Sequence, residues 1–273
     1  GNTMSNYKAI VTDMDDTLLN SDNEVSSATQ DYLVKVQEAG YHLILASGRP
    51  TEGMLPTARD LQMDRFGSYL ISYNGGQTIK VADESVEVSQ TIDKDQYDEI
   101  IDYLRDQGFF KATYKDGYII YEGEHEYMNI ESELTGLPMK QVDDIKAYIQ
   151  EEVPKVLGVG YESNIKEAYQ SMEDQHFNDD IDVTMSKPFF LEFIAKDVSK
   201  GNAIQQLTQK LDFSMEEIVA FGDSTNDLSM LKEVGCGVAM DNASDEVKDI
   251  ADKVTLSHDD DGIPHALKEL GIE

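Results

Sequence analysis

The stretch Val11-Thr12-Asp13-Met14-Asp15-Asp16-Thr17-Leu18-Leu19 places an acidic cluster directly after a short apolar run. The apolar character of residues 7–12 predicts a buried strand, so that Asp13 lies where the strand ends. Asp13 and Asp15 then point into one cleft, where they repel each other unless a cation, a shared proton or a cationic substrate group holds them. The alternative is that Asp15 or Asp16 only caps a following helix. Partners elsewhere in the chain distinguish these interpretations.

The chain is strongly acidic, with 22 basic against 54 acidic side chains and a formal net charge of -32 over 273 residues. Such a surface repels nucleic-acid phosphates and anionic membranes, so we expect neither as a partner. It also repels an anionic small substrate. A phosphate-binding site in this chain therefore requires a bound cation and local positive side chains.

The composition also indicates where the protein acts and what role its single cysteine has. No apolar run approaches the ~20 residues that span a membrane, and we expect no signal peptide. Cys236 lies in the apolar run Cys236-Gly237-Val238-Ala239-Met240, which predicts a buried packing role. One cysteine allows no intrachain disulfide and fits a reducing cytoplasm, where we expect the protein to act.

Two stretches of the chain alternate between strand-like and helix-like segments. The first predicts strands at 7–12, 42–46 and 69–73, with helices at 26–39 and 52–61 between them. The second predicts helices at 200–211 and 227–234 and strands at 218–221, 237–239 and 253–255. This order predicts an α/β fold with a parallel, doubly wound (Rossmann-like) core sheet.

Between these stretches the pattern changes to short alternating strands, a Lys115-Asp116-Gly117 hairpin signal and separate helices. The strands are predicted at 79–81, 86–88, 111–114, 118–121, 156–160, 182–185 and 189–194, and the helices at 95–107, 125–134, 143–151 and 164–174. The tyrosines of this region, Tyr97 among them, are expected to pack in its interior. The pattern predicts an inserted α+β domain. We place the core domain at 1–82 and 189–273, and the inserted domain at 83–188.

Polar groups follow or precede the predicted core strands at one edge of the sheet, where open α/β folds bind ligands. Each has a structural alternative, as a helix cap, a first-turn residue or a solvated charge. The groups are Asp13 and Asp15, Ser47 with Arg49, Lys200, and Asp223 with Asp227.

Together these residues resemble the four motifs of the haloacid dehalogenase superfamily, and most closely its Cof-type phosphatases. The matching segments are Asp13-Met14-Asp15-Asp16-Thr17, Ser47-Gly48-Arg49, Lys200-Gly201-Asn202 and Gly222-Asp223-Ser224-Thr225-Asn226-Asp227. The tail Val238-Ala239-Met240-Asp241-Asn242-Ala243 matches as well. Asp16 stands where the family often has glycine. The inserted domain matches only in type and size, as the cap of such enzymes.

The resemblance implies a role for each matched residue. Asp13 would attack phosphorus to form an aspartyl-phosphate, and Asp15 would protonate the leaving oxygen and then activate water. Lys200 would neutralise the crowded anions. Ser47, Gly48 and Asn226 would hold the substrate phosphate, and Thr17 would orient the first loop. Arg49 would touch phosphate or brace its loop.

The resemblance also implies Mg²⁺, which prefers hard oxygen ligands. Its ligands would be Asp13, the backbone carbonyl of Asp15, Asp223 and Asp227, the last directly or through water. No histidine or cysteine spacing favours zinc.

We therefore expect a magnesium-dependent phosphatase that hydrolyses phosphate monoesters of small metabolites, sugar phosphates first among them. One alternative is a phosphomutase that uses the same intermediate. The other is a phospho-accepting regulatory module similar to response-regulator receivers. Oligomeric state is not readable from the sequence.

Overall fold

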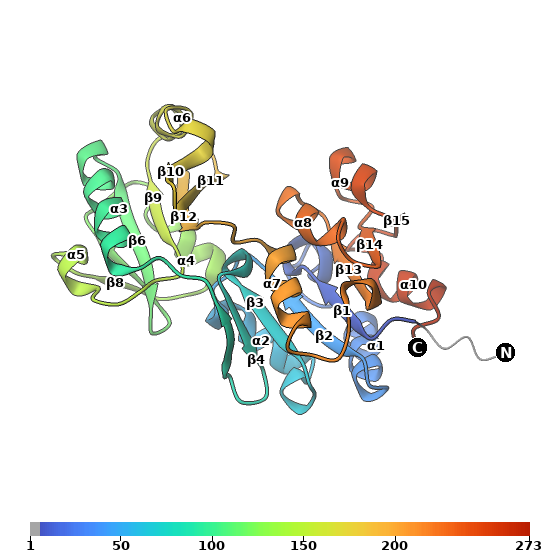
Figure 1. Ribbon diagram of the computed structural model, residues 1–273. Helices are drawn as coiled ribbons and strands as arrows, with labels where there is room; N and C mark the ends of the chain where they lie inside the picture. The colour runs from blue at the N-terminus through green and yellow to red at the C-terminus, as the bar shows by residue number, and fades with distance from the viewer. Residues whose placement is uncertain (1–5) are drawn as a thin grey trace. The chain divides into compact units, whose positions relative to one another are not determined.

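The computed structural model describes residues 6–273 and divides the chain into two compact units (Figure 1). The first unit contains the chain up to Ser89 and again from Ser199 onwards, and the second unit is Gln90–Val198. Each unit has its own sheet. The predicted α/β core with an inserted α+β unit is confirmed.

The core sheet has eight strands in the order β15-β14-β13-β1-β2-β3-β4-β5. The strands from β15 to β3 in this order pair in parallel, and β4 and β5 extend the sheet antiparallel. Their bounds are β1 (Ala9–Thr12), β2 (His42–Ala46), β3 (Tyr69–Ser72), β4 (Gln77–Lys80), β5 (Val86–Ser89), β13 (Ile218–Gly222), β14 (Cys236–Ala239) and β15 (Lys253–Val254).

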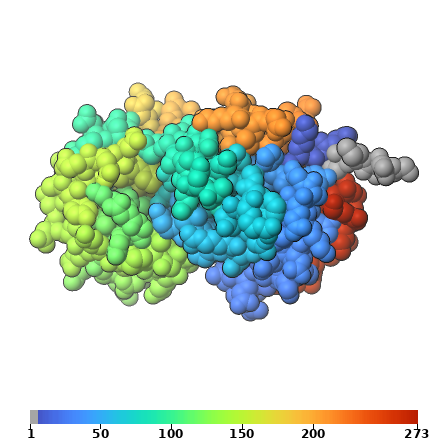
Figure 2. Space-filling model, turned by 90° about the horizontal axis from the view of Figure 1, so that it is seen from below, coloured from blue at the N-terminus to red at the C-terminus, as the bar shows by residue number. Residues whose placement is uncertain are grey.

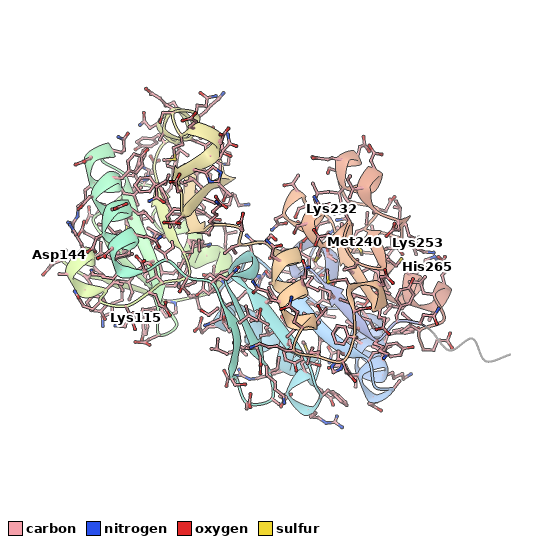
Figure 3. The ribbon with its side chains drawn as sticks, viewed as in Figure 1. Lys115, Asp144, Lys232, Met240, Lys253 and His265 are labelled. Atoms are coloured by element: carbon pink, nitrogen blue, oxygen red, sulfur yellow. The ribbon has the colours of Figure 1, made fainter. Side chains whose placement is uncertain are left out.

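Helices pack on both faces of this sheet. Side chains of α1, α2 and α10 form one buried apolar cluster with the strands, and those of α7, α8 and α9 form another on the opposite face. Met240, just after β14, belongs to the first cluster and is fully buried (Figure 3). The bounds are α1 (Ser27–Glu38), α2 (Thr51–Asp60), α7 (Lys200–Thr208), α8 (Leu228–Leu231), α9 (Asp245–Ile250) and α10 (Gly262–Glu269).

The strand order reverses at β1, which lies between β2 and β13. Chain segments that leave the carboxyl ends of β1 and β13 therefore diverge to opposite sides and leave a crevice between them. Asp13 follows β1 and Asp223 follows β13. The fold thus brings together two motifs that are distant in the sequence.

The second unit contains a seven-stranded sheet in the order β10-β11-β12-β9-β6-β7-β8. Side chains of α3, α5 and α6 pack with the sheet in one buried apolar cluster. The elements are α3 (Lys94–Gln107), β6 (Phe110–Lys115), β7 (Tyr118–Glu122), α4 (Ile130–Thr135), β8 (Met139–Gln141), α5 (Ile145–Tyr148), β9 (Val156–Val159), α6 (Glu162–Gln170), β10 (His176–Asn178), β11 (Ile181–Lys187) and β12 (Phe190–Ala195).

The chain crosses between the units later than the predicted boundaries at 83 and 188. Strand β5 pairs with β4 in the core sheet, although it follows residue 83. Strand β12 pairs with β9 and β11 in the second sheet, although it follows residue 188. The predicted strands exist, but a period-two pattern does not say which sheet a strand joins.

Several predicted helices of the second unit are shorter than expected. The helix predicted at 125–134 begins only at Ile130, and that predicted at 143–151 is confined to Ile145–Tyr148. Strands β8 and β10 were not predicted, because each has only three residues. Tyr97 is fully buried in the apolar cluster, in agreement with a packing role for it.

Figure 2 shows the β4–β5 hairpin (cyan) on the surface of the first unit. Val86 in β5, the last strand of the sheet, is 55% exposed. Cys236 is buried, as predicted. Within residues 6–273, no helix is both long enough and apolar enough to cross a membrane.

Stability should depend strongly on the centre of the core sheet. Leu45 in β2 is fully buried, whereas Leu256, just after β15, is 42% exposed. We expect Leu45→Ala to lower the free energy of unfolding by about 2–5 kcal/mol, because it leaves a cavity between strand and helices. Leu256→Ala is the matched control, with a change within about 0.5 kcal/mol. Urea denaturation measures both, and equal effects would contradict the assignment of the core.

Candidate active site

The loop that carries Asp13 and Asp15 follows β1 directly. Asp13 has an extended backbone, its N–H donates to the carbonyl of Phe221 in the neighbouring strand, and its side chain accepts from the N–H of Met14 at 2.7 Å. A single wide helical turn, Met14–Leu18, follows. Asp13 is only 5% exposed. The carboxylate of Asp13 is therefore held at the end of the strand, as the sequence predicted.

Lys200 joins Asp13 to the fourth motif. Its ammonium group lies 3.1 Å from Oδ1 of Asp13 and 2.6 Å from Oδ1 of Asp227. The side chains of Lys200 and Asp227 are fully buried. The sequence alternative of a solvated surface lysine is therefore wrong.

Asp227 also shapes the loop that carries Asp223. Its Oδ2 accepts the backbone N–H groups of Asp223 at 2.9 Å and Ser224 at 3.2 Å. A Cβ atom on Gly222 would lie 2.6 Å from Cβ of Asp227, so only glycine leaves room for this side chain. Asp223 in turn accepts a hydrogen bond of 2.7 Å from the hydroxyl of Thr17. Thr17 thus links the first loop to the fourth.

The buried charges perturb one another. Burial, followed by the negative charge of Asp227, raises the pKa of Asp13 well above its ordinary value, although Lys200 opposes the shift. Burial raises the pKa of Asp223 to about 6. Burial is the largest influence on Asp227 and disfavours its charged form, but the charge of Lys200 and the hydrogen bonds that Asp227 accepts together outweigh burial and hold the pKa of Asp227 below its ordinary value. Despite burial, the charges of Asp13 and Asp227 raise the pKa of Lys200.

These residues fit a divalent cation. Carboxylate oxygens of Asp13, Asp223 and Asp227 all lie within 4.8 Å of one another. Lys200 is the one lysine or arginine in residues 6–273 that forms an ion pair with any of them, so the cluster carries excess negative charge. Hard oxygen donors with excess negative charge suit a cation such as Mg²⁺. The donor set contains no sulfur or imidazole, which disfavours zinc.

Asp15 lies beside Arg49 rather than beside Lys200. The guanidinium donates from Nη2 to Oδ1 of Asp15 at 2.6 Å and from Nε to Oδ2 at 3.0 Å. Arg49 is also tied to the carbonyl of Gly53 and to Asn23, at 3.4 Å each. A contact between Arg49 and Asp15 was not predicted. Their separation of 34 positions leaves no local signal for it.

Ser47 and its neighbours form the second loop of the edge. Ser47 is buried, and its hydroxyl oxygen accepts the N–H of Arg49 at 3.0 Å, which leaves the hydroxyl hydrogen free to donate. Gly48 lies against the side chain of Asn74, 3.2 Å from where its Cβ would be. Asn226 donates to Asn74 at 2.9 Å. The three residues predicted for phosphate binding therefore lie on loops that Asn74 connects.

Asp16 adopts the left-handed backbone conformation expected from its glycine-like position, with φ of 59°. Its carbonyl accepts a hydrogen bond of 2.9 Å from Asn242, which had no predicted role. The position of Asn242 after β14, at the carboxyl edge of the sheet, is the signal that could have identified it.

The fold and the cluster of Asp13, Lys200, Asp223 and Asp227 agree with the hydrolase class whose motifs the sequence resembles. Comparisons with known proteins establish the family. The model of the haloacid dehalogenase-like hydrolases matches residues 10–267, so the chain belongs to that family and, within it, to the Cof type.

Three relatives illustrate the similarity. A haloacid dehalogenase-like hydrolase from Bacteroides thetaiotaomicron has 33% identity and a TM-score of 0.89, over 97% of this chain and 99% of that one. The subclass IIB sugar phosphatase BT4131 has 26% identity and a TM-score of 0.79, over 97% and 100%. The 5-amino-6-(5-phospho-D-ribitylamino)uracil phosphatase YcsE of Bacillus subtilis (strain 168) is 29% identical, over 96% of this chain and 94% of that protein. The chain is a phosphatase.

The raised pKa of Asp223 makes stability pH-dependent in the metal-free protein. Because the folded state binds this proton more tightly than the unfolded state, the stabilisation is complete below the ordinary carboxyl pKa and is lost as pH rises through about 6. Asp223→Asn removes that loss. At pH 8 the variant should exceed wild type by about 1–2 kcal/mol, which allows for partial exposure of the side chain, and the gain should shrink towards zero near pH 4.

Urea denaturation in a chelator at pH 4, 6 and 8 measures this gain. Asp22→Asn, at an exposed carboxylate, is the matched control. A gain for Asp223→Asn that is the same at all three pH values would contradict the burial-driven shift.

Proposed function

We propose that the chain is a magnesium-dependent phosphatase that hydrolyses phosphate monoesters of small metabolites through an aspartyl-phosphate on Asp13. The observation that carries the proposal is the buried contact of Lys200 with Asp13 and Asp227, beside Asp223, at the point where the strand order reverses. It supplies a nucleophile, a fixed cation and a set of metal ligands in one place.

Asp13 is the proposed nucleophile. Lys200 and the N–H of Met14 both contact its Oδ1, and Oδ2 is the proposed attacking oxygen. The bond from phosphorus to the ester oxygen breaks, and the leaving oxygen takes a proton from Asp15. A water molecule then attacks the aspartyl-phosphate, gives its proton to Asp15 and releases inorganic phosphate.

Asp15 can transfer protons only after it leaves its present partner. Both of its oxygens are bound by Arg49, so the carboxyl group must separate from the guanidinium before it can reach the leaving oxygen. This contact supports a bracing role for Arg49 in the free enzyme. Ser47, the backbone at Gly48 and Asn226 are the proposed donors to the phosphate oxygens.

Asp13 and Asp223, with the backbone carbonyl of Asp15, would hold Mg²⁺. Asp227 would contribute through the remaining lone pair of Oδ1 or through water, since Lys200 and two backbone N–H groups already occupy its other positions. When bound, the cation neutralises charge on the phosphoryl group and its surroundings.

Sugar and polyol phosphates are the proposed substrate class. BT4131 is named a sugar phosphatase, and the substrate in the name of YcsE carries a phosphorylated ribityl chain. Both are phosphate esters of polyhydroxylated carbon chains. The second unit would select among them, and we expect the reaction to take place in the cytoplasm.

Substitution of the two first-motif carboxylates tests the mechanism. Asp13→Asn should abolish magnesium-dependent turnover of an aryl phosphate, by on the order of 10³-fold or more, because the amide is not a nucleophile. Asp15→Asn should lower kcat by about 10²–10⁴-fold, the usual contribution of a general acid and base. Asp22→Asn is the control with expected wild-type activity. An Asp13→Asn variant that retains activity would refute the aspartyl-phosphate.

The metal and the substrate class are tested together by phosphate release. A screen over sugar phosphates, polyol phosphates, nucleotides, flavin mononucleotide and pyridoxal phosphate should give highest kcat/KM with sugar or polyol phosphates. Activity should vanish in a chelator and return with Mg²⁺. Isomer formation without phosphate release would instead indicate a mutase, and a phospho-protein that persists for minutes would indicate a regulatory module.

A further inference from the structure

Asp16 holds an unfavourable backbone conformation between two functional positions. Its φ of 59° and ψ of 16° lie in the left-handed region, whereas Asp15 just before it is extended. This conformation costs a residue with a Cβ atom more free energy than it costs glycine, although aspartate tolerates it better than most residues, so contacts on Asp16 help to maintain it. If Asp16 relaxed, the peptide group between Asp15 and Asp16 would rotate. The carboxyl group of Asp15 would then move with it.

The amide of Asn242 is one contact that maintains this conformation. Its Nδ2 donates to the carbonyl oxygen of Asp16 at 2.9 Å, and its Oδ1 accepts the backbone N–H of His258 at 3.1 Å. Asn242 therefore joins the first loop to the segment before α10. Both functional groups of its amide are used.

The side chain of His258 is the second contact. Its Nε2 lies 3.9 Å from Oδ1 of Asp16 and 3.3 Å from the hydroxyl of Ser21, and the side chain is 13% exposed. The contact with Asp16 is an ion pair only when the imidazole is protonated, and the same nitrogen lies 3.8 Å from Oδ2 of Asp259. Asp259, beside His258, accepts both the N–H and the hydroxyl of Ser21.

A third anchor strengthens the same connection. Asp261 accepts hydrogen bonds from the hydroxyls of Ser26 and Thr29, at the start of α1. The segment Ser257–Asp261 is thus tied to the chain after β1 at several points. We call this segment the brace.

We propose that Asn242, and His258 in the brace, are positioning residues for the phosphatase reaction: they hold Asp16 in its left-handed conformation and so fix the backbone from which the side chain of Asp15 reaches the leaving oxygen once it has left Arg49. The inference rests on the proposed role of Asp15 as acid and base. Neither residue touches the reacting atoms. They act on the backbone that carries Asp15, so their loss should affect the chemical step rather than phosphate binding.

Asn242→Asp tests the first contact at nearly constant volume, because it keeps the acceptor for His258 but replaces the donor to Asp16 by a carboxylate oxygen. We expect kcat to fall about tenfold or more with KM within about twofold, the pattern of a misplaced catalytic group. Asn129→Asp, an exposed asparagine whose side chain caps no helix, is the control. A kcat within about twofold of wild type in Asn242→Asp would overturn the proposal.

Asp16→Gly separates positioning from general structural damage. Glycine adopts the left-handed conformation without a Cβ penalty, so the loop needs the amide of Asn242 less. The loss of kcat caused by Asn242→Asp should therefore be several-fold smaller in the Asp16→Gly background. Equal losses in the two backgrounds would show that Asn242 does not act through Asp16 and would overturn the proposal.

His258→Ala is the second test and does not depend on how well Asn242→Asp folds. It should lower kcat in the same direction by a smaller factor, because its contact with Asp16 is longer. The control is His265→Ala, since His265 lies on α10 (Figure 3), where its Nε2 is 2.9 Å from Oε1 of Glu269. An unchanged kcat in His258→Ala would remove His258 from the proposal. Failure of the proposed role of Asp15 appears separately, as an Asp15→Asn variant with full activity, and failure of the proposed function appears as a wild-type protein that releases no phosphate with Mg²⁺.

Discussion

The fully buried ammonium group of Lys200 contacts two carboxylates, Asp13 and Asp227, and the site depends on this interaction. A buried charge is tolerated only when it is paired and hydrogen-bonded, so the start of α7 and the ends of β1 and β13 are fixed relative to one another. One cation does not balance three carboxylates, and burial, followed by the negative charge of Asp227, raises the pKa values of Asp13 and Asp223. The interaction that assembles the site therefore leaves a cluster of carboxylates that could hold a metal ion.

The sheet makes this interaction possible across a long chain separation. Asp13 and Asp223 follow neighbouring parallel strands at the reversal of strand order, so their loops share one crevice. The second unit is inserted between Ser89 and Ser199. It therefore interrupts the sequence of the core but not the core sheet. A surface with a formal charge of -32 repels phosphate, so attraction for substrate has to come from the site itself.

Asp16 illustrates how a locally unfavourable residue is maintained at a functional loop. Its left-handed backbone costs free energy that glycine would not, and the compensating contacts come from Asn242 and His258, far away in the sequence. Asp15 is similarly restrained by Arg49. The proton-transfer residue of the proposed mechanism is therefore positioned on both sides by partners from other loops.

The order of strands and helices in the core, and the chemistry at the strand ends, follow from the sequence alone, because apolar periodicity and the acidic, serine and lysine motifs are local. The predicted domain boundaries assigned β5 and β12 to the wrong sheets. Which sheet a strand joins depends on the partner strand beside it, here β4 for β5 and β9 for β12, and not on the pattern of the strand itself. The contacts of Asp15 with Arg49 and of Asp16 with Asn242 were likewise decided only by the tertiary structure. They join residues separated by long stretches of chain, and only closure of the fold brings such groups within hydrogen-bonding distance.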